Sequence, residues 1–201
     1  MKRQTKKAIN HVFFTTAAIV GLLVVISLLA QTEFDMDHDV LTDEVKGYTP
    51  TVEKYAKIYG VADHVGILLA MMMQESGGRG NDPMQSSESY CGERKCIKDP
   101  ELSIKQGVYY FSQTLKAADG DLELAIQSYN FGKGFIEYAL ENKGKYTQEV
   151  AVNFSQKMYA NATNKAKYSC AREGAREKDA CYGDIYYVRD VMDLREKIVK
   201  D

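Results

Sequence analysis

The feature of this 201-residue chain that most restricts its fold is the apolar segment 64–75, HVGILLAMMMQE. Apolar side chains occupy almost every position, without the alternation of a strand or the single stripe of a surface helix. Such a helix has to be surrounded by other elements, so the sequence predicts a buried central helix. The segment ends in an ionisable residue, Glu75, and Gly77 and Gly78 then predict a left-handed helix end.

Capping residues and apolar spacing predict further helices around this one. Thr49-Pro50 offers an N-cap and a first-turn proline for a helix that ends near Ile58. Asp99-Pro100 starts another helix by the same logic, and Ala118-Asp119-Gly120 ends it. Shorter helices are predicted around 122–129, 135–140, 150–158 and 188–198. The predicted fold class is all-α, or α+β at most, with small hairpins possible only in 77–90 or around 170–181.

The N-terminal residues predict a membrane anchor. Residues 12–30 carry no charge and are long enough to cross a bilayer. Four basic residues precede this segment and no Lys or Arg follows it until Lys46, which predicts export of the remainder. A signal peptide cleaved near Ala30 is the alternative, but the length of the apolar run favours a retained anchor. We therefore expect a cytoplasmic tail (1–11), a single transmembrane segment (12–30), an acidic spacer (31–48) and one domain on the cell-wall side (49–201).

The charge balance and the cysteines limit the kinds of ligand that the exported part is expected to bind. It holds 22 basic and 28 acidic residues, a balance that disfavours nucleic acid as a ligand. All four cysteines lie there, where disulfides are permissible, and short loops favour the pairs Cys91–Cys96 and Cys170–Cys181 among the three pairings. The chain has no C-x-x-C motif and its three histidines are scattered, so we expect neither zinc nor any other cofactor.

Glu75 is a candidate general acid. Burial penalises the ionised form of its carboxyl, and the negative end of the helix dipole acts in the same direction, so its pKa should rise. A carboxylic acid that stays protonated near neutral pH is what glycoside hydrolysis requires for proton donation to the leaving oxygen. The alternative is an ordinary surface glutamate at a frayed helix end.

Three short motifs resemble those of the lysozyme-like superfamily of goose-type lysozymes and lytic transglycosylases. They are QESGG at 74–78, MQSSES at 84–89 and AIQSYNFG at 125–132, in the same order and at similar spacing. The chain is similar in particular to the muramidase domain of CwlT-like wall hydrolases, found on conjugative elements of Gram-positive bacteria. The segments 99–108 and 182–188 also fit, so the resemblance covers about residues 50–194. The Cys91–Cys96 loop and an extra loop at 161–181 depart from the family pattern.

The resemblance implies roles for individual residues. Glu75 matches the catalytic acid, and Asp82 falls in the loop that holds a second functional carboxylate. Tyr129 matches a tyrosine expected to hydrogen-bond or pack on the Glu75 carboxyl, and Asn130 is expected to hold backbone or sugar. The residues that match the substrate-lining motif are Gln85, Ser86 and Ser87.

Each of these assignments has an ordinary structural alternative. Tyr129 also fits a core tyrosine, and Asn130 fits a helix C-cap. Asp82 is also a typical turn residue before Pro83, and Glu88 is a rival second carboxylate.

The resemblance implies an N-acetylmuramidase that cleaves the MurNAc–GlcNAc β-1,4 bond of peptidoglycan. A lytic transglycosylase is the first alternative, because its chemistry requires Glu75 but no second carboxylate. A non-catalytic glycan-binding scaffold and an adhesin or channel component are further alternatives. By analogy with the family, the expected purpose is local wall opening for a conjugation or secretion machine, with channel proteins as possible partners.

Overall fold

A computed structural model describes residues 13–27 and 40–200 of the chain. These belong to two compact units, Met1–Asp39 and Val40–Asp201. The first unit contains a helix over residues 13–27 with exposed apolar side chains. The predicted tail, the ends of the predicted 12–30 span and most of the predicted spacer lie outside the described residues. Within the described part of the chain, we find no helix that combines the length and apolar character needed to span a membrane.

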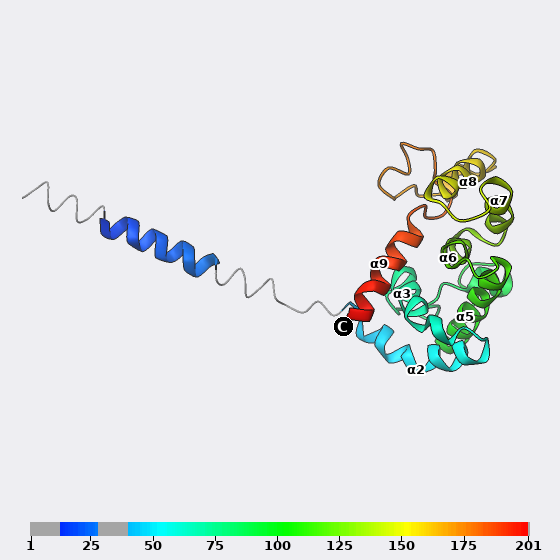
Figure 1. Ribbon diagram of the computed structural model, residues 1–201, viewed down its shortest axis with the longest axis horizontal. Helices are drawn as coiled ribbons and strands as arrows, with labels where there is room; N and C mark the ends of the chain where they lie inside the picture. Colours follow the sequence, from blue (N-terminus) through cyan, green and yellow to red (C-terminus); the bar gives the residue numbers. More distant parts are fainter. Residues whose placement is uncertain (1–12, 28–39, 201) are drawn as a thin grey trace, which may run out of the picture. The chain divides into compact units, whose positions relative to one another are not determined.

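The second unit is built from helices, and no strand occurs in the residues that the structure describes (Figure 1). The all-α fold class is therefore confirmed for this unit, and neither possible hairpin forms. Its elements are α2 (Asp43–Ile58), η1 (Ala62–His64), α3 (Val65–Glu75), α4 (Ser87–Cys91), α5 (Pro100–Ala117), α6 (Leu122–Phe131), α7 (Gly134–Asn142), α8 (Gln148–Ala160), η2 (Lys165–Lys167) and α9 (Tyr187–Lys200).

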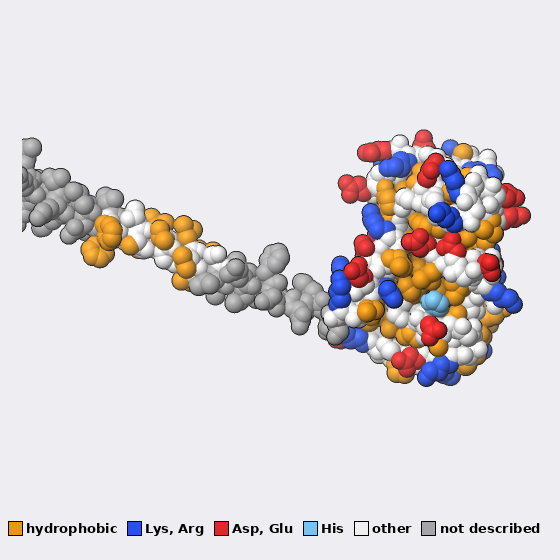
Figure 2. All heavy atoms as spheres, viewed as in Figure 1, with side chains coloured by type: hydrophobic (Ala, Val, Ile, Leu, Met, Phe, Trp, Pro, Cys, Tyr) orange, Lys and Arg blue, Asp and Glu red, His pale blue; other side chains and the backbone are white. Residues whose placement is uncertain are grey.

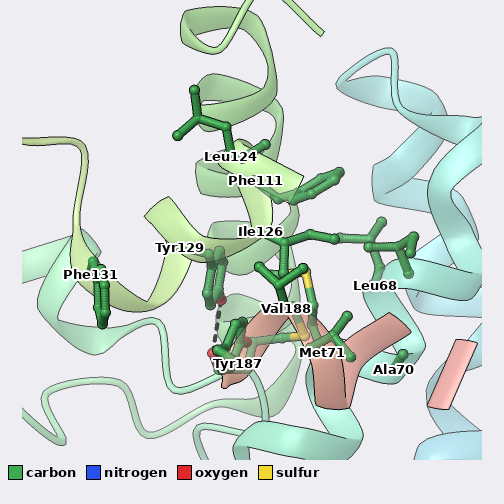
Figure 3. Close-up of a cluster of buried hydrophobic side chains, with 14 of the residues drawn as sticks. Leu68, Ala70, Met71, Phe111, Leu124, Ile126, Tyr129, Phe131, Tyr187 and Val188 are labelled. Atoms are coloured by element: carbon green, nitrogen blue, oxygen red, sulfur yellow. Dashed lines mark hydrogen bonds between the residues drawn. The ribbon is translucent and has the colours of Figure 1, made fainter. Parts of the chain in front are cut away.

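Helix α3 is the buried central helix that the apolar segment predicts. Leu68 and Met71 are fully buried, and Figure 3 shows them beside Phe111 of α5, Ile126 of α6 and Val188 of α9. Helix α9 runs alongside α3 (Figure 1). Burying each of these large side chains stabilises the fold by about 1.5–3 kcal/mol. The end of α3 is therefore held firmly from several sides.

Capping residues fix the start of one helix and the end of another near the site. Asp99 accepts hydrogen bonds from the backbone N–H groups of Glu101 and Leu102, and Pro100 is the first residue of α5. Gly132 ends α6 with a positive φ of 86°. The start of α5 confirms the sequence prediction, because it depends on local residues with a strong conformational preference.

The predicted start of the first domain helix at Thr49-Pro50 is wrong. Helix α2 begins seven residues earlier, at Asp43 in place of Pro50, and Pro50 lies inside it. The Thr42 hydroxyl accepts a hydrogen bond from Val45 N (3.3 Å) and donates one to Gly77 O (2.8 Å). Val45 is fully buried, so tertiary packing extends the helix beyond the start that the proline favoured. Residues 43–48 therefore belong to the folded unit and not to a spacer.

Two disulfides close loops of the domain. Cys91 pairs with Cys96 and Cys170 with Cys181, which is the local pairing that the sequence favours. On the visible face of the second unit, acidic and basic side chains are interspersed with apolar ones (Figure 2).

Candidate active site

A cleft of about 610 Å³ opens beside the end of α3. The residues that the sequence assigned to a site come together in it, although they come from three separate segments. The predicted residues that line the cleft are Glu75, Asp82, Gln85, Ser86, Ser87, Tyr129 and Asn130, and the rival carboxylate Glu88 lines it too. Further lining residues are Ser89, Arg94, Lys95, Tyr110, Phe131, Gly132, Tyr182 and Gly183.

Glu75 is placed by the way α3 ends. The backbone N–H of Gly77 donates to Met72 O and Met73 O, and Gly77 and Gly78 have φ values of 61° and 77°. This confirms the predicted left-handed end. A Cβ at Gly78 would lie 2.9 Å from both Glu44 Cβ and the Val45 nitrogen, so a side chain there would collide with α2. The helix therefore stops immediately after Glu75 and leaves its carboxyl at the cleft.

The pKa of Glu75 is raised to about 7. Burial is the main cause, and the negative charges of Asp184 and Asp82 add to it. The Tyr187 hydroxyl donates a 2.6 Å hydrogen bond to Glu75 Oε1, which opposes the rise in pKa. Arg172, from the extra loop, donates to Asp184 Oδ1 at 2.9 Å. Glu75 is thus a carboxyl group that keeps its proton to a higher pH than an ordinary glutamate.

The hydroxyl that donates to Glu75 belongs to Tyr187, so the hydrogen bond expected from Tyr129 to this carboxyl does not form. Tyr129 Oη donates instead to the backbone oxygen of Met84 (2.8 Å). Both tyrosines are buried, and Figure 3 shows them close together on α6 and α9. Because a buried carbonyl needs a donor, the Met84 oxygen takes the Tyr129 hydroxyl. Tyr129 therefore fixes the loop after Asp82.

Tyr187 is the site residue that sequence reasoning missed. It lies in the 182–188 segment that fits the family, but it stands at the start of α9 among apolar positions and is 2% exposed. From its neighbours in the sequence, Tyr187 cannot be distinguished from an aromatic residue of the core. Its contact with Glu75 joins residues 112 positions apart, so no nearby pattern marks it.

Asp82 is buried and fully hydrogen-bonded. Its Oδ1 accepts from Ser86 N (2.9 Å) and Ser103 Oγ (2.6 Å), and its Oδ2 accepts from Ser87 N (3.1 Å) and Ser87 Oγ (2.6 Å). Burial alone would raise the pKa of Asp82, but hydrogen bonds from Ser103 and Ser87 outweigh it, so the pKa lies below its usual value. Asp82 is a fixed negative charge that also organises the start of α4.

Of the remaining predicted residues, one is exposed at the cleft and the others form hydrogen bonds within the protein. Gln85 is exposed at the cleft with a φ of 47°, and its side-chain nitrogen donates to Asp82 O (2.9 Å). Ser86 Oγ donates to Ser103 O (2.9 Å), so its hydroxyl is held by the protein. Asn130 Oδ1 accepts from Asp184 N (2.7 Å) and thus holds backbone, one of the two roles expected for it.

The rival carboxylate Glu88 lies at the rim of the cleft and is engaged by a neighbouring side chain. The exposed Glu88 forms an ion pair with Arg94 (3.2 Å). In residues 13–27 and 40–200, no group of three or more His, Cys, Asp or Glu side chains is arranged to hold a metal ion.

An all-helical domain whose buried central helix ends in a carboxyl group at an open cleft is a lysozyme-like domain. The chain belongs to the Lysozyme-like family, whose sequence profile matches residues 42–195.

Named relatives agree with this assignment. The bifunctional muramidase/DL-endopeptidase CwlT of Bacillus subtilis (strain 168) is 48% identical over 116 residues, which cover 58% of this chain and 35% of that protein. The uncharacterized membrane protein YocA of the same organism is 37% identical over 163 residues, covering 79% of this chain and 72% of the relative. The chain thus spans about a third of CwlT.

A solved structure is also similar. It is a crystal structure from Staphylococcus aureus subsp. aureus Mu50 described as similar to lipoprotein, NLP/P60 family. The TM-score is 0.65 at 37% identity, and the match covers 77% of this chain and 53% of that chain. The likeness therefore extends over most of the folded unit described above.

Proposed function

We propose that this protein is a peptidoglycan hydrolase, an N-acetylmuramidase that cleaves the β-1,4 bond between MurNAc and GlcNAc. The observation that carries the proposal is Glu75, a buried carboxyl with a pKa of about 7 at a cleft that also holds an ionised Asp82. Two carboxyl groups whose environments push their pKa values apart are typical of an acid and a charge stabiliser in glycoside cleavage. The similarity to a protein named as a muramidase supports peptidoglycan as the substrate.

In this proposal Glu75 does the proton chemistry. Its protonated carboxyl gives a proton to the glycosidic oxygen as the bond to the MurNAc anomeric carbon breaks. The developing positive charge on the sugar is stabilised by the fixed charge of Asp82. Water then attacks the anomeric carbon and gives a proton back to the Glu75 carboxylate, so the acid is regenerated.

A specific observation favours a second candidate, a lytic transglycosylase. Each oxygen of the Asp82 carboxylate already accepts two hydrogen bonds, so neither is available to activate a water molecule. In a transglycosylase no such base is needed, because the hydroxyl of the muramyl sugar itself attacks and an anhydro product forms. In both candidates Glu75 is the acid, and Asp82 acts through its charge and through the loop that it holds.

The products distinguish the candidates. The full-length protein, Glu75→Gln and Asp82→Asn are incubated with purified Gram-positive peptidoglycan, and the released fragments are analysed by mass spectrometry. Reducing MurNAc ends support the muramidase, and anhydro-MurNAc ends support the transglycosylase. Glu75→Gln is expected to lower the rate roughly 10²- to 10⁴-fold, the usual contribution of a general acid. A folded wild-type protein that releases no fragments would leave a glycan-binding scaffold as the better explanation.

We also propose that the domain works on the wall side of the cell membrane, with residues 12–30 as a single-pass anchor. The uncharged run and the basic residues before it support this placement. Cell fractionation with N-terminal sequencing of the mature protein tests it, because a cleaved segment would release the domain and leave a new N-terminus near residue 31.

The cellular role proposed for the enzyme is local wall opening for a conjugation or secretion machine, on family analogy alone. Deleting the gene in a host that carries the machine should reduce DNA transfer or secretion. Complementation with Glu75→Gln should not restore it. Equal DNA transfer or secretion with the wild-type and the Glu75→Gln allele would contradict this role.

A further inference from the structure

The loop between α4 and α5 brings positive charge to the cleft. Its residues 91–96, CGERKC, are closed by the Cys91–Cys96 disulfide, and Arg94 and Lys95 both line the cleft that holds Glu75. This loop thus places two basic side chains at the cleft.

Lys95 is an exposed cation at the cleft that forms no ion pair within residues 40–200. Of the exposed charged side chains that line the cleft, Glu88 and Arg94 pair with each other at 3.2 Å, whereas the negative charge of Asp82 is buried and held by serines. The rim of the cleft is therefore suited to an anionic group on the ligand.

The backbone holds Lys95 in a conformation that lysine rarely adopts. Its φ is 62°, in the left-handed region, where a residue with a side chain is strained. The next residue, Cys96, is tied to Cys91, so the loop keeps this shape without a ligand. A loop whose backbone is fixed in advance loses less freedom when an anion binds to a side chain that it carries.

We infer that the Cys91–Cys96 loop is a specificity element that uses Lys95 to bind a carboxylate of the glycan substrate. The inference rests on the proposed function, because it takes peptidoglycan as the occupant of the cleft. The sugar rings are neutral, so a charge must come from their substituents. Two sources carry the same chemistry: the free carboxylates of the stem peptides, and the lactyl carboxylate of MurNAc where no peptide is attached.

Three substrates separate these sources. The first is purified peptidoglycan with its peptides, the second is glycan strands stripped by an amidase, and the third is the stripped strands with their lactyl carboxylates converted to methylamides. The full-length wild type and Lys95→Gln are compared by kcat/KM from the rate of new ends. Lys98→Gln is the matched control, because Lys98 is exposed close to the loop but does not line the cleft.

We expect wild type to prefer a charged substrate, and Lys95→Gln to lower the ratio of charged to neutral kcat/KM roughly five- to tenfold, as for one charge-assisted contact. A lower ratio only for peptide-bearing material assigns the stem peptide, a lower ratio only for stripped strands assigns the lactyl group, and a lower ratio for both shows that Lys95 binds either carboxylate. Lys98→Gln should keep the wild-type ratio. The preference should also shrink as salt is raised.

An unchanged ratio in Lys95→Gln, or an equal drop in Lys98→Gln, overturns the inference. A binding measurement keeps it separate from the enzyme assignment. Retention of soluble strands by Glu75→Gln is compared with retention by Glu75→Gln/Lys95→Gln. If wild type releases no ends from any substrate, the proposed function fails, and the binding comparison still decides whether Lys95 selects a carboxylate.

Discussion

At the scale of single residues, the site assigns different tasks to two buried tyrosines. Tyr187 donates its hydroxyl to the acid itself, whereas Tyr129 donates to Met84 O in the neighbouring loop. The first contact acts directly on the protonation of Glu75. The second acts on the shape of the segment that carries Asp82. Removing either hydroxyl should therefore have a distinct signature.

Tyr187→Phe should move the alkaline limb of the pH–activity profile to higher pH. The Tyr187 hydroxyl stabilises the ionised Glu75 and lowers its pKa, so without it burial acts unopposed and the carboxyl stays protonated further into the alkaline range. The rate at the optimum should fall roughly 10- to 100-fold, because the acid is less well positioned. A pH series with solubilised peptidoglycan measures both effects.

Tyr129→Phe is the matched control for that experiment. It removes one buried hydroxyl of the same kind and leaves the Met84 oxygen without its donor, which should cost about 1–3 kcal/mol of stability. Its alkaline limb should move less than that of Tyr187→Phe. Identical limbs in the two variants would show that the Tyr187 contact does not tune the acid.

The Glu75→Gln variant should gain stability relative to wild type as pH rises. The unfolded carboxyl ionises near about pH 4.3, and the folded one near 7. Between these values the unfolded chain has released the proton that the folded protein still holds, so rising pH favours unfolding of wild type. The variant lacks this proton, and the gain should reach up to about 3 kcal/mol at pH 8. Denaturant unfolding at pH 4 and pH 8 measures it, and a constant difference between the proteins would contradict it.

Sequence patterns identify the acid but not all of its surroundings. Glu75 stands out because an ionisable residue ends an apolar helix at two glycines, and this signal is contained within a few positions. The Tyr187 contact depends on how α9 docks against α3, which no local pattern encodes. Likewise, the saturation of Asp82 depends on Ser103, which arrives from α5. Residue identities at the cleft are therefore more predictable than their hydrogen-bond partners.

At the scale of elements, α5 carries a glycine that sets how closely the site loop approaches. A Cβ at Gly107 would lie 2.7 Å from Met84 Cβ and 2.9 Å from Tyr129 Oη. Ala is normally the better helix former, by about 1 kcal/mol. Here the close approach reverses that preference, because the loop and the tyrosine would have to move.

Gly107→Ala should therefore destabilise the protein by about 1–3 kcal/mol and lower its activity. Gly134→Ala, also within a helix but with nothing within 4 Å of the added Cβ, is the control and should be neutral or slightly stabilising. Thermal melting and wall-clearing rates measure both variants. Similar melting temperatures for the two would mean that the loop yields easily.

Helix starts show where local signals give way to packing. The Asp99-Pro100 start of α5 agrees with its local signal because the cap and the packing coincide. At α2 they do not coincide: Pro50 is a strong local signal, but the burial of Val45 and the Thr42 cap place the start at Asp43. A prediction from sequence takes the proline into account, but it has no information on how the first turn of α2 packs against Gly78.

At the scale of the whole molecule, the folded unit depends on its first residues. A protein that starts at residue 49 lacks the Thr42 cap and the fully buried Val45, and it uncovers Gly78. The loss should amount to roughly 3 kcal/mol or more relative to a protein that starts at residue 40. Comparing the denaturant midpoints of the 40–201 and 49–201 proteins measures it. Equal midpoints would show that the first turns of α2 contribute nothing.

The hydrogen bond from Thr42 to Gly77 O also has a mechanical consequence. The chain enters the domain just before Thr42, and that bond ends two residues after Glu75. A force that pulls on the N-terminal side of residue 40 is therefore transmitted first to the turn that positions the acid, before it reaches the core. Stretching single molecules from the N-terminus should unfold Thr42→Val at a lower force than wild type. A load applied at the N-terminal side of the domain and proton transfer at the cleft then act on the same turn of backbone.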